Sequence, residues 1–233
     1  MKHLLYTLTL LVSVGFLSSC NTNQKQMENT PIDWDSEFTT QGLHKIDTDS
    51  TKIIVELRYA TTDNFMGKNV YGNLRTGYLQ PEALSKLLNA QHMLNEEAPE
   101  LRLLIYDVAR PRRIQQVLWD SSDLPLEERS QYIANPVSGS IHNYGCAVDL
   151  TIAKADGTPL DMGTGYDDFS TLAHTDNEEE LVAQGLLTSQ QRENRLLLRS
   201  VMTKAGFLTL DSEWWHFDAF SRSETKTRFS IVE

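Results

Sequence analysis

Residues 140–149 read SIHNYGCAVD and join a polar turn to the start of an alternating strand. From Cys146 to Ile152 apolar residues occupy every second position, and Asp149 falls between them on the opposite face. Cys146 shares the apolar face, so we interpret it as a small buried residue rather than a thiolate ligand. The stretch therefore predicts a strand with one core face and one face that presents Asp149.

Helix and strand signals alternate irregularly from Lys52 to the C-terminus, without the repeated βαβ order of a parallel sheet. Pro81 and Pro111 mark helix starts, and Gly206 marks a helix end. We expect strands over 52–60, 101–106 and 146–152, helices over 81–98, 111–119, 124–133 and 188–205, and a terminal hairpin over 207–220. This mixture favours an α+β fold, a single domain with a mainly antiparallel central sheet flanked by helices.

The first 45 residues differ in character from the rest. An apolar run over 4–17 ends in Leu17-Ser18-Ser19-Cys20, which is typical of a bacterial lipoprotein processing site. We predict a signal peptide over 1–19, a lipidated Cys20 with a flexible tether over 20–45, and a catalytic domain over 46–233. The protein is then an extracytoplasmic lipoprotein anchored to a membrane by its N-terminal lipid. The alternative is an ordinary signal peptide in which Cys20 has no role.

Charge and cysteine content narrow the function classes. The formal net charge is −11 and no basic patch is evident, so we expect no nucleic-acid partner. The chain has two cysteines, too few for a secreted fold held together by disulfides.

A second polar motif, Glu213-Trp214-Trp215-His216, completes a candidate metal site. His142, Asp149 and His216 offer three ligands, which is the number that a catalytic zinc site uses when its fourth position stays open. Glu213 and His216 face opposite ways on a regular strand, so a bulge or bend is needed to bring them together. The alternative is an aromatic hairpin with incidental polar residues.

The chain carries five motifs of spaced polar, aromatic and glycine residues. They are Ser140-x-His142-x-x-Gly145-x-Ala147-x-Asp149, Glu213-x-Trp215-His216, Arg58-Tyr59-Ala60-Thr61-x-Asp63-Asn64-Phe65-x-Gly67, Tyr106-Asp107-x-x-Arg110-Pro111 and Met162-Gly163-x-x-Tyr166-Asp167. Together they resemble the zinc peptidases that cut D-alanyl peptides, and among these the D-alanyl-D-alanine dipeptidases of the vancomycin-resistance type. The resemblance covers the chain from about Lys52 onward and implies a fold like that of hedgehog-type domains and D-Ala-D-Ala peptidases.

The same resemblance implies a role for each matched residue. His142, Asp149 and His216 are expected to bind one zinc ion per chain. Glu213 is expected to act as the general base, and Arg110 to face the oxyanion that develops on the scissile carbonyl. Asp167 and Tyr59 are expected to receive the free amino group of a dipeptide, and Ser140 to help hold its carboxylate.

Three functions follow from these expectations. The first is zinc-dependent hydrolysis of the dipeptide D-Ala-D-Ala to D-alanine in cell-wall peptide turnover. The second is a D,D-carboxypeptidase or endopeptidase that uses the same metal site on peptidoglycan stem peptides. The third is a binding lipoprotein without activity, which would be expected to lack Glu213 or Arg110; both are present.

Overall fold

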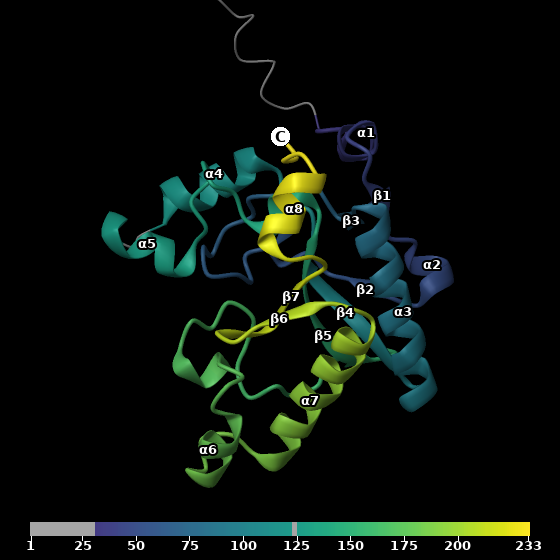
Figure 1. Cartoon of the computed structure of the whole chain (residues 1–233), viewed down its shortest axis with the longest axis vertical. Coiled ribbons are helices and arrows are strands. Elements are labelled where there is room, and N and C mark those ends of the chain that lie inside the picture. The colour runs from purple at the N-terminus through teal and green to yellow at the C-terminus, as the bar shows by residue number, and fades with distance from the viewer. Residues whose placement is uncertain (1–30, 123–124) are drawn as a thin grey trace, which may run out of the picture. The chain divides into compact units, whose positions relative to one another are not determined.

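A mixed sheet carries the fold. In the computed structural model, which describes residues 31–122 and 125–233, five strands pair in the order β2-β4-β5-β7-β6 (Figure 1). Their bounds are Ile54–Val55 for β2, Leu101–Asp107 for β4, Ala147–Lys154 for β5, Glu213–Asp218 for β7 and Leu208–Leu210 for β6.

The direction of β2 corrects the prediction of a mainly antiparallel sheet. β2 pairs parallel to β4, with Ile54 opposite Leu104, whereas β4–β5, β5–β7 and β6–β7 pair antiparallel. The chain passes from β2 to β4 through helix α3 (Pro81–Glu97), and a helical crossover of this kind returns the chain in the same direction. The sheet is therefore mixed, within the expected single domain of helices and strands.

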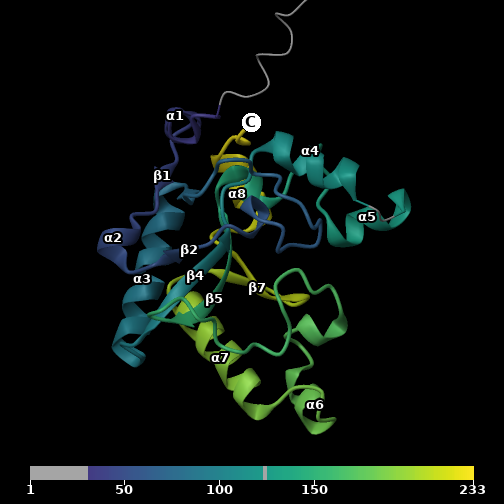
Figure 2. The same ribbon diagram turned by 180° about the vertical axis from the view of Figure 1, so that it is seen from behind.

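Two helices cover one face of the sheet. α3 begins with Pro81 at its first position, and α7 (Ser189–Lys204) begins with a capping box between Thr188 and Gln191. Both helices were predicted, α3 from Pro81 at its start and α7 from Gly206 after its end. They lie side by side (Figures 1 and 2). α3 contacts β4 and α7 contacts β5, in which every residue from Ala147 to Ala153 is buried.

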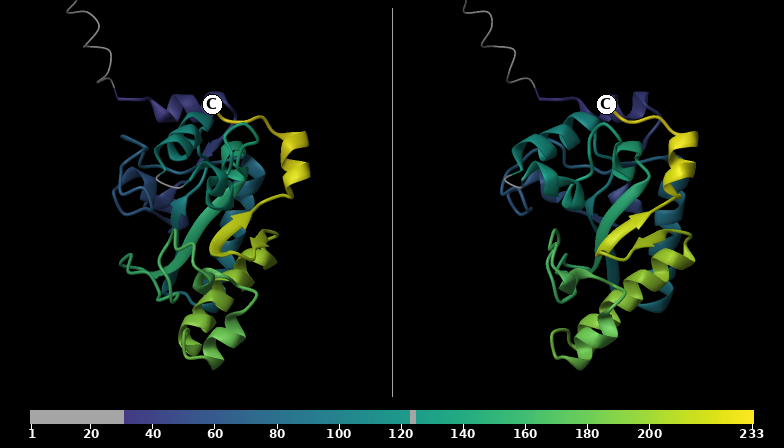
Figure 3. Two further views of the ribbon diagram at one scale, coloured as in Figure 1. Left: turned by 90° about the vertical axis from the view of Figure 1, so that its left-hand side faces the viewer. Right: turned by 60° about the vertical axis from the view of Figure 1, so that its left-hand side comes forward.

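The opposite face carries the loop after β5 and the two helices after β4 (Figure 3). These helices are α4 (Arg112–Ser121) and α5 (Leu126–Tyr132), both close to their predicted positions. The short helices η4 (Thr171–Ala173) and α6 (Glu178–Ala183) follow in the loop region. No helix among the described residues is both long and apolar enough to cross a membrane.

The strand predicted over 52–60 is shorter than expected. Only Ile54–Val55 pairs in the sheet, and Arg58–Ala60 forms the 3₁₀ helix η2. The Asn64 side chain explains the break, because its amide donates to the carbonyl oxygens of Arg58, Thr61 and Lys68. A carbonyl satisfied by a local side chain has less need of a neighbouring strand.

The folded unit begins earlier than predicted, at Ile32. Helix α1 (Trp34–Thr40) buries Trp34 and Phe38, and the Phe38 ring stacks on Tyr78 at a centroid distance of 4.6 Å. The prediction of a tether over 20–45 is therefore wrong from residue 32 onward, because buried aromatic rings fix this part of the chain to the domain. The predicted signal peptide and Cys20 lie outside the described residues.

The remaining elements complete the domain around α1. They are β1 (His44–Lys45) paired with β3 (Tyr78–Leu79), α2 (Thr48–Thr51) and the C-terminal helix α8 (Arg222–Arg228), which was not predicted. The C-terminal residue lies beside α1 (Figure 2), where the Glu233 backbone N–H donates to the Gln41 side chain at 3.1 Å.

We expect Phe38→Ala to lower the free energy of unfolding by about 3–5 kcal/mol, the usual loss when a buried aromatic ring is removed. Denaturant unfolding of the two proteins measures the difference. Ile32→Ala is the matched control, because Ile32 is exposed. An unchanged stability in Phe38→Ala would mean that α1 does not belong to the cooperative unit.

Candidate functional site

His142 lies in a buried 3₁₀ turn, η3 (Ile141–Tyr144), directly before β5. The Ser140 hydroxyl accepts from the His142 backbone N–H, and the Asn143 side chain accepts from the Ser140 N–H. Gly145 ends the turn at a φ of +66°, where a Cβ would also lie 2.8 Å from the Leu43 side chain. Glycine is required here on both grounds, and this tight exit lets the chain turn from His142 into the strand.

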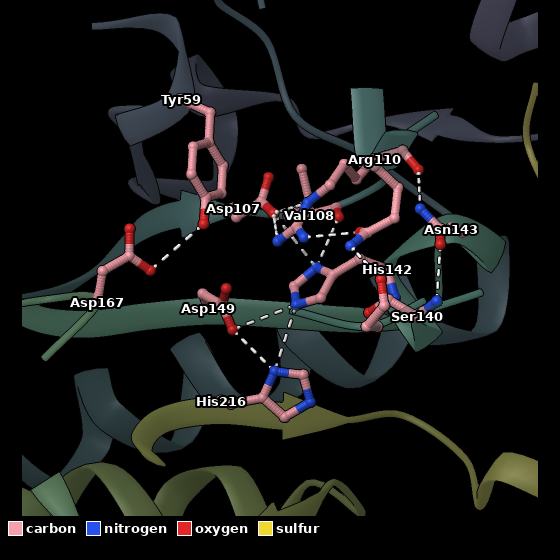
Figure 4. A network of polar contacts seen from close by, with 12 residues as sticks. Tyr59, Asp107, Val108, Arg110, Ser140, His142, Asn143, Asp149, Asp167 and His216 are labelled. Carbon is pink, nitrogen blue, oxygen red and sulfur yellow. Dashed lines mark hydrogen bonds and ion pairs between the residues drawn. The ribbon is translucent and has the colours of Figure 1, made fainter. Parts of the chain in front are cut away.

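Three side chains converge from η3, β5 and β7. Asp149 and His216 are register partners on adjacent strands, and His142 reaches them from the turn (Figure 4). His142 Nε2 lies 3.3 Å from Asp149 Oδ1 and 3.3 Å from His216 Nδ1, and His216 Nδ1 lies 2.9 Å from Asp149 Oδ1. The structure thus brings together the three residues expected to bind a metal.

The outer nitrogens of both rings have acceptors. His142 Nδ1 lies 2.8 Å from the Val108 carbonyl oxygen, and His216 Nε2 lies 2.9 Å from Asp218 Oδ1. An N–H that donates outward leaves the inner nitrogen with its lone pair directed at the centre, which is the usual arrangement of metal-binding histidines.

The spacing of the three donor atoms fits a metal ion. Donors about 2.0–2.1 Å from a tetrahedral zinc ion lie about 3.3–3.4 Å from one another. Two of the three spacings are 3.3 Å, and the third is 2.9 Å. Two neutral nitrogens and one carboxylate oxygen are also an established zinc donor type.

Charge reinforces this geometry. Burial by itself disfavours charge on Asp149 and His216, but each stabilises the charged form of the other. The two histidines hold the pKa of Asp149 well below its usual range. The carboxylates of Asp149 and Asp218 hold the pKa of His216 well above its usual range. A metal ion held by these residues would displace the proton from His216 and balance the charge of the carboxylates in its place.

Glu213 faces the same cavity as His216, as the metal-site hypothesis required. The pairing of β6 with β7 is irregular here: Thr209 pairs with Phe217, but Leu210 pairs with Glu213. The expected break in strand regularity is therefore confirmed. Trp214 and Trp215 are buried around it, and burial raises the pKa of the Glu213 carboxyl.

Arg110 also lines this cavity, and buried side chains hold its guanidinium in place. Its Nε and Nη2 donate to Asp107 Oδ2 at 2.9 and 2.6 Å, and its Nη1 donates to Gln115 Oε1 at 2.9 Å. The guanidinium also lies over the Tyr59 ring, 4.9 Å from its centroid. Asp107 and Gln115 are fully buried, so this arginine has little freedom to move.

Asp167 and Ser140 lie on opposite sides of the three candidate ligands (Figure 4). Asp167 accepts from the Tyr59 hydroxyl at 3.3 Å and from the Phe65 backbone N–H at 3.2 Å. Burial raises its pKa to about 8. Its φ of +61° is unusual for a residue other than glycine, and such backbone conformations cluster at functional sites.

All eight residues expected in the site thus line one cavity of about 360 Å³. Cys146 is absent from its lining and lies fully buried on the other side of β5, as its parity predicted. Burial raises the pKa of its thiol to about 12, so it remains protonated and is no metal ligand. The eight residues are Tyr59, Arg110, Ser140, His142, Asp149, Asp167, Glu213 and His216.

Comparison with known proteins identifies the family. A family model described as D-ala-D-ala dipeptidase matches residues 39–232. The chain belongs to this family. Its members are hydrolases that in general depend on zinc, which agrees with the donor set described above.

Curated relatives carry the same description. A D-alanyl-D-alanine dipeptidase of Escherichia coli (strain K12) is 35% identical over 164 residues, which is 70% of this chain and 77% of the relative. Proteins of the same name from Enterococcus faecium and Streptomyces coelicolor are 31% and 30% identical. They cover 70% and 76% of this chain, and 83% and 90% of their own lengths are matched.

The sequence did not predict two residues that hold site side chains in place. Asp218 holds the His216 ring, and Asp107 holds Arg110. Asp107 falls within a motif that was recognised, three residues before Arg110, and an acid so placed was an available signal. Asp218 had no comparable signal, because an acid two residues from a histidine is common on any exposed strand.

We expect Asp218→Ala to weaken metal binding about 10- to 100-fold, because the His216 ring loses the acceptor that orients it. Titration with zinc against a chelating dye measures the affinity directly, without reference to activity. Asp211→Ala, an exposed acid in the turn between β6 and β7, is the matched control. Equal affinity of Asp218→Ala and the unchanged protein would contradict this role.

Proposed function

We propose that this protein is a zinc-dependent dipeptidase that hydrolyses D-Ala-D-Ala to two molecules of D-alanine. One observation carries the proposal: a single cavity of about 360 Å³ holds the candidate metal donors between an acid for an ammonium group and a hydroxyl for a carboxylate. A dipeptide carries those two charges at its two ends, and a site that contacts both selects for its length. The names of the relatives support the D-alanyl substrate.

His142, Asp149 and His216 would hold one zinc ion. When bound, zinc supplies Lewis acidity, which polarises the scissile carbonyl and makes a water molecule acidic near neutral pH. The protein fixes the donors beforehand, since two adjacent strands and a capped turn position them and two outward hydrogen bonds orient the rings.

Glu213 is the general base. It removes a proton from the attacking water and delivers a proton to the nitrogen that leaves as the amine. Its buried position raises its pKa above that of an ordinary glutamate, which makes it a stronger base. Trp215, which is buried, lines the cavity beside it and limits its contact with bulk water, which strengthens charge interactions there.

Arg110 stabilises the oxyanion that develops as water adds to the carbonyl. Its contacts with Asp107 and Gln115 fix the guanidinium before the substrate arrives, so little reorganisation is needed during the reaction.

Asp167 receives the ammonium group of the substrate. With a pKa of about 8 its carboxyl is protonated at neutral pH in the empty cavity, and an arriving ammonium group lowers that pKa. Binding at neutral pH therefore releases a proton and forms an ion pair sheltered from solvent. The Tyr59 hydroxyl and the Phe65 N–H then stabilise the carboxylate.

Aromatic rings around Asp167 favour a dipeptide over a stem peptide. Phe65 and Phe169 meet edge to face at 5.6 Å, and Tyr132 of α5 lies 5.3 Å from Phe169. All three rings line the cavity. A peptide extended at its amino end has to pass these rings and also lacks the ammonium group, whereas a D,D-carboxypeptidase needs an open groove there.

The zinc-loaded protein is expected to release D-alanine from D-Ala-D-Ala, and Glu213→Gln to lower kcat about 10²- to 10⁴-fold, since an amide cannot accept the proton. Zinc content, measured on the same samples, is expected to stay unchanged. Equal activity of Glu213→Gln and the unchanged protein, with zinc retained, would support a binding protein instead.

Substrate comparison separates the dipeptidase from the alternative peptidase. N-acetyl-D-Ala-D-Ala and a pentapeptide stem are expected to be poor substrates, and Asp167→Ala to impair hydrolysis of the free dipeptide alone. Cleavage of the pentapeptide as fast as the dipeptide would instead identify a D,D-carboxypeptidase or endopeptidase acting on peptidoglycan.

We also propose that the protein is a lipoprotein attached outside the cytoplasm through Cys20, where D-Ala-D-Ala released in cell-wall turnover would be its substrate. The support is the sequence pattern Leu17-Ser18-Ser19-Cys20. Cys20→Ala is expected to move the protein from the membrane fraction to the soluble fraction of the producing cells. Unchanged membrane attachment of this variant would refute the anchor.

A further inference from the structure

The cavity has an acidic lining, which raises a problem for the carboxylate end of a dipeptide. Its acids are Asp149, Asp167, Glu213 and Asp218. Of these, Asp149 lies at the candidate metal and Asp167 at the amino end, and the α-carboxylate at the other end of a dipeptide is held best by a positively charged donor. A neutral hydroxyl such as that of Ser140 does not supply that charge, and in this structure it already accepts from the His142 N–H.

Two cationic side chains line the cavity among the described residues, Arg110 and Arg222. Arg110 is paired with the Asp107 carboxylate, and all three of its nitrogens donate to Asp107 or Gln115. Its charge is therefore already balanced. Arg222 has no carboxylate of the described residues within 4.0 Å of its guanidinium.

Arg222 lies at the end of the cavity where the carboxylate is expected. It is the first residue of α8, and its Nη2 donates to the carbonyl oxygens of Gly139 at 2.7 Å and Ser138 at 3.4 Å. Gly139 directly precedes Ser140, and Ser140 lies across the three candidate ligands from Asp167 (Figure 4). Arg222 and Asp167 thus belong to opposite ends of one cavity.

The contacts of Arg222 prepare it to bind an anion. A guanidinium has five N–H donors in a fixed plane, and the two backbone carbonyls engage donors of Nη2 only. The Nε–H and both Nη1 N–H groups have no hydrogen bond to a described residue, so Arg222 keeps charged donors for an anion, and anchoring at Nη2 reduces the entropy lost when they bind.

We propose that Arg222 binds the free α-carboxylate of the peptide substrate and is a specificity-determining residue of this enzyme. The inference rests on the proposed dipeptidase function. Asp167 then reads the positive end of the dipeptide and Arg222 the negative end, with the scissile bond held between them at the candidate metal. Only a zwitterion of dipeptide length satisfies both residues.

Paired substrates test the proposal. For the zinc-loaded enzyme, Arg222→Gln is expected to raise KM for D-Ala-D-Ala about 10- to 100-fold, the usual effect of losing a charge-assisted hydrogen bond. KM for D-Ala-D-alaninamide, which has no carboxylate, is expected to change less than about 3-fold. Arg222→Lys keeps the charge but loses the guanidinium donors and the anchor at Gly139, and its KM is expected to fall between the two. Lys226→Gln, an exposed cation on the same helix, is the matched control.

The outcomes are distinct. A rise in KM confined to the carboxylate substrate supports the proposal. An equal loss on both substrates in Arg222→Gln would show that Arg222 only holds the 138–140 segment, and would overturn it, as would unchanged kinetics. A failure of the unchanged, zinc-loaded protein to cleave either substrate would instead refute the proposed function. Binding of D-Ala-D-Ala to Glu213→Gln with and without Arg222→Gln, measured by calorimetry, then still tests the carboxylate contact.

Discussion

Strand pairing at the centre of the sheet determines the relative positions of the residues in the candidate site. Asp107 of β4, Asp149 of β5 and His216 of β7 are register partners in one row across three adjacent strands. Backbone hydrogen bonds fix the spacing of such a row, so the carboxylate of Asp149 and the ring of His216 meet without any loop to position them. His142 joins from a turn that Ser140 and Gly145 terminate on its two sides. A slip of one residue between β5 and β7 would turn Asp149 away from His216 and destroy the site.

Irregularities in the same sheet supply the other functional groups. The shift between Ile105 and Asp107 brings Asp107 level with Asp149, and from there it holds Arg110. The break between β6 and β7 lets Glu213 share a cavity with His216. Bulges redirect side chains at the edge of a regular ladder, and here each one adds a charged group near Asp149 and His216, the two donors that come from the regular part of the sheet.

The sequence was most informative where local chemistry dictates structure. Pro81, Gly206 and the alternation after Cys146 placed two helices and the central strand, and parity alone removed Cys146 from the candidate ligands. The sequence was least informative where contacts between distant parts of the chain determine burial or strand direction. The burial of Trp34 and Phe38 depends on Tyr78, and the direction of β2 depends on the crossover through α3. The contact of Asp218 with His216 and the position of Arg222 in the cavity likewise depend on how β7 and α8 pack in the folded chain.

Burial gives the acids of this cavity different properties. Asp149 faces two histidines, which hold its pKa low, whereas Asp167 forms no ion pair with a described residue, and burial raises its pKa to about 8 despite the charge of Arg110. An empty cavity with a neutral Asp167 carries less negative charge than its sequence implies, which lowers the repulsion that an approaching carboxylate meets. If Asp167 receives an ammonium group, as proposed above, it ionises on binding and the ion pair forms away from water. The cavity would then be most polar when a zwitterion fills it, and a protonated Asp167 otherwise spares the fold an unpaired buried charge.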